Sequence, residues 1–195
     1  MKQVFSGFGC AGENQSPQLS WSNAPEGTKS YSITLFDPDA PSGSGWWLWV
    51  VFDIPADGGE LAAGAGTPGW PGMPAGAMQN TTDLGGPGYG GPCPPTGHGP
   101  HQHVLTLHAL KVDNLGLDAK ASAPMVGFNL SQKTLAKASI VFYYERRSRH
   151  YETTSGRTCG GSLSNGAPEI QPGRIPIRAM SNNAPLQRVT PDQVP

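Results

Sequence analysis

Charged residues are scarce in this chain of 195 residues, at 14%, and aromatic residues make up only 8%. The formal net charge is −1, so no broad electrostatic field favours nucleic acid or an anionic membrane surface as a partner. The sequence has no apolar run of about 18 residues, the length that a membrane-spanning helix needs. We therefore expect a protein that neither spans a membrane nor binds nucleic acid.

Arginine is absent from the first three quarters of the chain. Residues 1–145 carry six Lys and eleven acidic residues, whereas residues 146–195 carry seven Arg, no Lys and three acidic residues. The two parts therefore have net charges of −5 and +4. This switch predicts a domain boundary at residue 145. Because residues 146–195 also lack hydrophobic periodicity, we expect them to form an Arg-rich and mostly disordered tail.

Cysteine is rare as well, and the count of three is odd. Cys10 and Cys93 lie in Gly-rich segments of the first part, whereas Cys159 lies in the tail. A disulfide between Cys10 and Cys93 would imply an oxidising compartment, and two reduced, partly buried thiols are the alternative. The first five residues contain no apolar segment typical of a signal peptide. The localisation is therefore open: we expect a cytoplasmic protein for the chain as written, and a periplasmic or secreted one if the true start lies upstream with a signal peptide.

Glycine and proline are abundant by contrast, with 27 and 20 residues, and 22 of these fall between residues 58 and 100. A connection of this length without a clear strand or helix is usually functional or disordered. Four large apolar side chains within it predict that it packs on the rest of the protein; these are Trp70, Met73, Met78 and Tyr89.

Short segments with strand-like patterns predict a mainly β fold. Residues 31–36 alternate apolar and small polar side chains, as in a half-buried strand, and the apolar run at 46–54 predicts a strand buried on both faces. In the strand expected at 103–112, the odd-numbered residues share one face. A short helix is expected at 131–138, with Ser131 as its N-cap, and a last strand at 138–144.

Two segments combine polar side chains with backbone stiffened by proline and glycine. The first is Asp-Pro-Asp-Ala-Pro at 37–41, closely followed by Gly-Trp-Trp-Leu-Trp at 45–49. The second is Gly-Gly-Pro-Cys-Pro-Pro-Thr-Gly at 90–97, which runs on to His-Gln-His at 101–103. Carboxylates and imidazoles on stiff backbone at strand ends can form a small, rigid polar pocket. Taken singly, each segment favours a plainer interpretation, namely an Asp-Pro turn and two solvent-exposed histidines.

Together, in this order and at this separation, the two segments resemble the signature regions of the phosphatidylethanolamine-binding protein family, in its bacterial Raf kinase inhibitor-like (YbhB/YbcL-type) branch. The resemblance begins at Phe-Ser-Gly-Phe-Gly-Cys (5–10) and reaches Gly-Phe-Asn (127–129) and the last strand. It implies a large β-sheet packed on a smaller one, with a few short peripheral helices. Residues 1–145 would be the family domain without the family's first strand. Some exported members have cysteines in these places, which favours the Cys10–Cys93 disulfide.

The resemblance also implies a protein that is not an enzyme and needs no cofactor or metal. Its pocket would bind phosphate or a phosphorylated headgroup such as phosphoethanolamine. His101 would donate to the ligand anion, and Asp37 would orient that imidazole or accept from a cationic end of the ligand. The ligand-binding positions that the resemblance assigns to this chain are Asp37, Asp39, Trp46, Leu48, Pro94, Pro95, His101 and His103.

Three positions depart from the family pattern. Leu48 stands where bacterial members have a second pocket histidine, Thr81 where some have arginine, and Gln102 where arginine or histidine is common. A charge-assisted hydrogen bond contributes about 1.5–3 kcal/mol, so losing one would weaken phosphate binding roughly ten- to a hundredfold. Since residues 1–145 offer no arginine, the alternative is a protein-interaction module, similar to kinase or protease inhibitors, with a vestigial pocket.

Two further interpretations of the histidines are weaker. Imidazoles at His98, His101, His103 and His108 could ligate a metal, but a third ligand at a usable interval is missing from the strand. Catalysis is not indicated either, since the chain has no Gly-x-Ser-x-Gly motif and Cys93 lies between two prolines rather than at a helix N-terminus.

Overall fold

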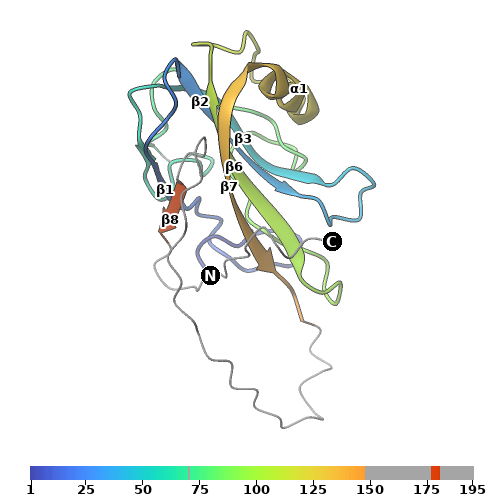
Figure 1. The fold of residues 1–195 in the computed structure, drawn as a ribbon. Helices are drawn as coiled ribbons and strands as arrows, with labels where there is room; N and C mark the ends of the chain where they lie inside the picture. Colours follow the sequence, from blue (N-terminus) through green and yellow to red (C-terminus); the bar gives the residue numbers. More distant parts are fainter. Residues whose placement is uncertain (70, 148–176, 181–195) are drawn as a thin grey trace, which may run out of the picture.

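The computed structural model of the chain describes residues 1–69, 71–147 and 177–180. Its strands and helix are β1 (Gln18–Trp21), β2 (Ser30–Asp37), β3 (Trp46–Pro55), β4 (Glu60–Leu61), β5 (Met78–Gln79), β6 (His101–Leu110), α1 (Ala123–Lys133), β7 (Thr134–Tyr144) and β8 (Ile177–Met180). The strands form a five-stranded sheet in the order β5-β3-β2-β6-β7 and a three-stranded sheet in the order β4-β1-β8. The predicted mainly β fold, with a large and a small sheet, is confirmed (Figure 1). No helix in the described ranges has the length and hydrophobicity to cross a bilayer.

The large sheet is covered on both faces, which separates two apolar cores. One face packs against the small sheet through a core that includes Leu19, Ile33, Leu35, Leu61, Leu105 and Leu107. The other face packs against α1 through a core that includes Val50, Phe52, Leu110, Val126 and Leu130. In Figure 1 the small sheet and the helix accordingly lie on different sides of β2, β3 and β6.

This double cover explains one correct and one wrong prediction of burial. β3 is buried on both faces, as its unbroken apolar run predicted. β2 was expected to be half-buried, but its small polar residues are buried too. The Ser32 hydroxyl donates to the carbonyl oxygen of Val51 at 2.7 Å, so its polar group is satisfied inside the protein. A serine that bonds to the neighbouring strand has the same sequence pattern as one that faces water.

Alternation in β6 is confirmed. The buried residues of this strand are the odd-numbered ones from His101 to Ala109, together with Leu110. The strand begins at His101, two residues before the predicted start, because His101 and Gln102 still pair with Tyr144 and Tyr143 of β7. Both histidines are consequently held on the face that continues into the core.

The helix lies earlier than predicted. It runs over Ala123–Lys133, and the side chain of Ser122 caps it by accepting from the backbone N–H of Met125 at 3.3 Å. Ser122 followed two residues later by Pro124 is the stronger start signal, because proline fits the first turn of a helix. The expected helix at 131–138 is therefore wrong. From Thr134 onward the chain alternates in burial and forms the first half of β7.

The glycine- and proline-rich connection at 58–100 packs on the rest of the protein, as predicted. Tyr89 is buried, Met73 packs against the core shared with the small sheet, and Met78 packs against the core under α1. The fourth predicted anchor, Trp70, lies outside the described residues.

The expected disorder of the tail does not hold for residues 177–180. These form β8, which pairs antiparallel with β1 and brings Leu19 opposite Ala179. An extended segment can pair with the edge strand of a sheet through backbone groups alone, so it cannot be predicted from hydrophobic periodicity. Residues 148–176 and 181–195, on which the rest of that prediction falls, lie outside the described part of the chain.

The N-terminal segment packs against the end of the 58–100 connection. The Tyr89 hydroxyl donates to the carbonyl oxygen of Gln3 at 2.8 Å, and the backbone N–H of Gly91 donates to the Asn14 side chain at 2.8 Å. At Gly91 the two segments approach so closely that a Cβ atom would lie 2.0 Å from the Gln3 carbonyl oxygen. Only glycine fits this crossing.

We therefore predict that Gly91→Ala destabilises the fold by about 1–3 kcal/mol, the usual cost of overpacking, measured as a loss in the free energy of unfolding. Gly86→Ala is the matched control, because no atom outside its immediate chain neighbours lies within 4 Å of a Cβ built there. Equal denaturant midpoints for the two variants would contradict this account of the crossing.

Candidate functional site

Four neighbouring strands of the large sheet, β3, β2, β6 and β7, have ends that lie side by side, and we call this end of the sheet its edge. β2 ends and β3 begins there, with Asp37 paired to Trp46. β6 begins and β7 ends at the same edge, with His101 paired to Tyr144. Because these strands are antiparallel, positions far apart in the sequence come together at this edge.

A β-bulge in β3 shapes the edge further. Leu35 of β2 pairs with Trp49, but the next residue, Phe36, pairs with Trp47, so Leu48 has no partner on β2. Leu48 and Trp49 consequently both join the core on the same side of the sheet, where strict alternation would send them to opposite sides. Trp49 fills the core, and Leu48 becomes part of a pocket wall.

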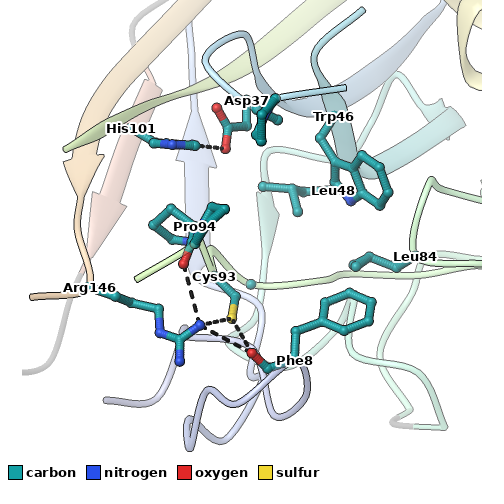
Figure 2. A pocket seen from close by; sticks show the side chains of 13 residues that line it. Phe8, Asp37, Trp46, Leu48, Leu84, Cys93, Pro94, His101 and Arg146 are labelled. Carbon is teal, nitrogen blue, oxygen red and sulfur yellow. Dashed lines mark hydrogen bonds and ion pairs between the residues drawn. The ribbon is translucent and has the colours of Figure 1, made fainter. Parts of the chain in front are cut away.

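The pocket at this edge has a volume of about 370 Å³. Its walls are formed by Phe8, Asp37, Ala40, Pro41, Trp46, Leu48, Leu84, Gly91, Cys93, Pro94, Pro95, His101 and Arg146 (Figure 2). The structure thus brings together six of the eight sequence-predicted residues, namely Asp37, Trp46, Leu48, Pro94, Pro95 and His101. The other two, Asp39 and His103, lie next to the pocket and do not line it.

The polar centre of the pocket is a hydrogen-bonded pair. Nδ1 of His101 lies 2.9 Å from Oδ2 of Asp37, and both side chains are buried. Since a carboxylate only accepts, the proton of this bond belongs to His101 Nδ1, which leaves Nε2 on the other side of the ring for a ligand. A neutral imidazole would accept a hydrogen bond at Nε2, and a protonated one would donate.

Asp39 fastens the loop that carries this pair. Its carboxylate accepts from the backbone N–H of Gln102 at 2.6 Å, and its own N–H donates to Oδ1 of Asp37 at 2.9 Å. The second aspartate therefore ties the end of β2 to the start of β6. It acts on the pocket through Asp37 and is not in its wall.

His103 contacts the Asp37–His101 pair from the core side of the sheet. It is fully buried, stacks on the Phe142 ring at a centroid distance of 5.2 Å, and its Nδ1 lies 3.1 Å from the carbonyl oxygen of His101. Burial lowers the pKa of His103 to about 4, although Asp37 and the bond to the His101 carbonyl act in the opposite direction. The ring is therefore neutral at pH 7 and donates to that carbonyl through Nδ1.

Arginine does reach the pocket, contrary to the expectation from composition. Arg146, the first residue of the predicted tail, lines the cavity. Its Nη2 donates to the carbonyl oxygen of Gly9 at 2.9 Å, and its Nη1 donates to that of Phe8 at 3.1 Å and lies 3.5 Å from that of Pro94. The pairing of β6 with β7 could have predicted this position, because a residue just past the end of β7 must lie beside the start of β6.

Sequence reasoning also missed much of the apolar wall. Phe8 and Leu84 lie on the same side of the pocket as Trp46 and Leu48, away from Arg146 (Figure 2). Phe8 comes from the segment 5–10, where the resemblance begins but which was given no pocket role, and Leu84 comes from the long connection. Only the folding of both segments onto this edge brings them to the site.

Cys10 and Cys93 form a disulfide, with their Cα atoms 6.1 Å apart. The residues alone left this pairing open. Cys93 lines the pocket, so the bond attaches the N-terminal segment that carries Phe8 directly to the pocket wall. The disulfide and Arg146 hold the same two segments together from neighbouring positions.

The remaining histidines do not build a metal centre in the described part of the chain. His98 is exposed, with its ring centroid 5.7 Å from that of His101. Among the residues that the structure describes, no group of three or more His, Cys, Asp or Glu side chains is arranged to hold a metal ion.

The chain is similar to known proteins in both sequence and structure. A family model described as phosphatidylethanolamine-binding protein matches residues 1–145, so it ends one residue before Arg146. The UPF0098 protein YbcL of Escherichia coli K12 is 47% identical over 142 residues, which cover 73% of this chain and 78% of YbcL. YbhB of the same organism is 48% identical over 139 residues, which cover 71% of this chain and 87% of YbhB. The crystal structure of E. coli YbcL, described as a new member of the mammalian PEBP family, matches with a TM-score of 0.71 over 73% of this chain and 87% of that one.

Loss of the disulfide should destabilise the protein by about 2–5 kcal/mol, because the bond closes a loop with a sequence separation of 83 residues. We expect guanidinium unfolding of the wild type to shift to lower denaturant when reductant is present. The double variant Cys10→Ser/Cys93→Ser should start at that lower midpoint and be insensitive to reductant. A wild-type midpoint that does not move after the thiols have been freed would contradict this expectation.

Acid should destabilise the protein through two histidines of β6, the buried His103 and the half-buried His108. The pKa of His103 falls from 6.5 to about 4 on burial, so the unfolded chain binds more protons between these pH values. The contribution of neutral His103 to the free energy of unfolding is thus complete above pH 6.5. It is lost as the pH falls toward 4, by about 2–3 kcal/mol at pH 4.5. We predict that His103→Phe, which keeps an aromatic ring on Phe142, shows a smaller loss of unfolding free energy between pH 7.5 and 4.5.

His108 provides an independent check on the other face of β6. Burial and the nearby Lys137 lower the pKa of His108 to about 4 as well. His108→Gln should therefore reduce the acid sensitivity by a similar amount, and the two substitutions should add. An acid sensitivity that stays at the wild-type value in His103→Phe would show that this histidine is not held neutral by the fold.

Proposed function

We propose, since this chain belongs to the phosphatidylethanolamine-binding protein family, that its pocket binds phosphate or a phosphorylated headgroup such as phosphoethanolamine. The observation that carries the proposal is the buried Asp37–His101 pair at 2.9 Å, which fixes one imidazole at the wall of a pocket. A ring fixed in this way is pre-organised for a ligand, because it loses little side-chain freedom when the ligand binds.

His101 is the proposed donor to the anion. When the ring is protonated, Nδ1 stays bonded to Asp37 and Nε2 donates to a ligand oxygen. Asp37 thereby keeps the ring oriented, with Nε2 on the side of the ring away from its carboxylate.

Arg146 supplies a positive charge in the pocket wall. Its guanidinium donates to backbone carbonyls, which are neutral, and among the described residues it forms no ion pair with a carboxylate. A fixed positive charge in the wall of a small pocket attracts an anion even without a direct bond. This charge offsets part of the loss expected from Leu48, which offers the ligand no donor.

We propose binding without turnover. Cys93 is held in a disulfide and has no thiolate to act as a nucleophile. Asp37 already accepts from His101 and from the backbone of Asp39, so its carboxylate is engaged on both oxygens. The alternative, a protein-interaction module with a vestigial pocket, stays a prediction that the next experiment separates from ligand binding.

The proposal is tested by calorimetric titration with phosphate and phosphoethanolamine. We expect the wild type to bind at least one of them and His101→Gln to bind it about ten- to a hundredfold more weakly, because a charge-assisted donor is lost. His108→Gln is the matched control, since His108 lies on the same strand with its side chain on the other face of the sheet. Its affinity should equal that of the wild type.

Two results would overturn the proposal in different ways. Equal affinity of wild type and His101→Gln would show that the anion binds somewhere other than this pair. Absence of binding to the wild type together with binding to Leu48→His would show a pocket of the family shape that no longer holds phosphate, and would favour the protein-interaction module.

A further inference from the structure

We propose that the pocket selects anions whose phosphate or phosphonate group carries an apolar substituent of about the size of a phenyl ring, with that substituent resting against Phe8. The inference rests on the proposed anion binding and specifies the class of ligand. It goes beyond inorganic phosphate and beyond headgroups whose substituent carries a charge.

Phe8 is held in an unfavourable conformation at the surface. Its side chain is 69% exposed, although it lines the pocket. Its backbone has a φ of 53°, in the left-handed region that bulky residues rarely adopt. The other non-glycine residues described with positive φ are Asn14, Asn23 and Asp53, which are types that tolerate it. Exposure together with backbone strain is a combination that packing alone does not explain, and such strain is often maintained for function.

The surroundings of Phe8 keep the ring in place. Its carbonyl oxygen and that of Gly9 both accept from Arg146, and Cys10 is linked to Cys93 in the pocket wall. The ring of Phe5 supports it from behind at a centroid distance of 5.5 Å. An exposed aromatic ring on a backbone fixed at three consecutive residues offers a ligand a contact surface at little cost in conformational entropy.

The side chains around Phe8 divide the pocket into a polar and an apolar side. His101 and Arg146 lie on one side, whereas Trp46, Leu48 and Leu84 lie on the other with Phe8 (Figure 2). Phe8, Leu48 and Leu84 carry no polar side-chain group, and Trp46 has only its indole N–H, so this side mainly excludes water from an apolar substituent. A volume of about 370 Å³ also exceeds what a phosphate ion alone would fill.

The test compares phenylphosphonate with methylphosphonate by calorimetric titration of the intact, oxidised protein. Both compounds present the same anionic group, so their difference reports the substituent. We expect phenylphosphonate to bind about tenfold or more tightly, because it removes most of a phenyl surface from water. We also expect it to bind more tightly than phosphoethanolamine, whose ammonium group would have to leave water against the apolar wall.

A pair of phenylalanine variants locates the effect. Phe8→Asn removes the ring but keeps a residue type that accepts positive φ, so the loop is expected to keep its shape. It should lower the preference for phenylphosphonate over methylphosphonate by about threefold to tenfold, the range for loss of one aromatic contact. Phe128→Asn is the matched control, because Phe128 is likewise exposed, at 65%, but lies on α1 away from the pocket. Its preference should equal that of the wild type.

The outcomes separate this inference from the proposed function. Binding of phosphate and both phosphonates with similar affinity would leave the anion pocket standing and overturn the inference, as would an unchanged preference in Phe8→Asn. Phosphoethanolamine binding as tightly as phenylphosphonate would overturn it in favour of a cation resting on the aromatic rings. No binding of any of these anions would overturn the proposed function and the inference together.

Discussion

The site depends on the hydrogen bond between Asp37 and His101, two buried polar side chains from neighbouring strands. Neither could be buried alone without a large desolvation cost, so each makes the position of the other tolerable. Asp39 fixes the carboxylate from the loop side, and His103 supports the pair from the core side. The pocket walls are assembled around this pair, with Leu48 placed by a bulge and Arg146 by the end of the last strand of the large sheet.

Much of this could be predicted from the sequence, because some patterns have only one physical meaning. The apolar run of β3 needs cover on both faces, and alternation in β6 assigns His101 and His103 to the core side. Proline and glycine residues around Asp37 and Pro94 predict rigid loops. The family resemblance then joined the two segments, which local patterns could not do, since the contact between Asp37 and His101 spans 64 residues.

What escaped prediction depends on tertiary contacts that leave no local pattern. Phe8 and Leu84 lie in irregular segments and become wall residues only when those segments fold onto the edge of the sheet. Arg146 was assigned to the tail because the composition changes at residue 146. A change of composition does not show where a strand ends or which residues follow it into a pocket. β8 was missed for a related reason, since edge pairing uses backbone atoms that every residue possesses.

The route of the chain through the pocket bears on how the protein is made. The wall joins Phe8, near the beginning, to Arg146, 138 residues later, and the disulfide partner Cys93 lies between them. During synthesis the contact between Phe8 and Arg146 can form only after residue 146 has left the ribosome. Contacts of such long sequence separation form late and slowly. The pocket wall is therefore complete only in a chain synthesised at least as far as residue 146, so ligand binding would distinguish such chains from shorter ones.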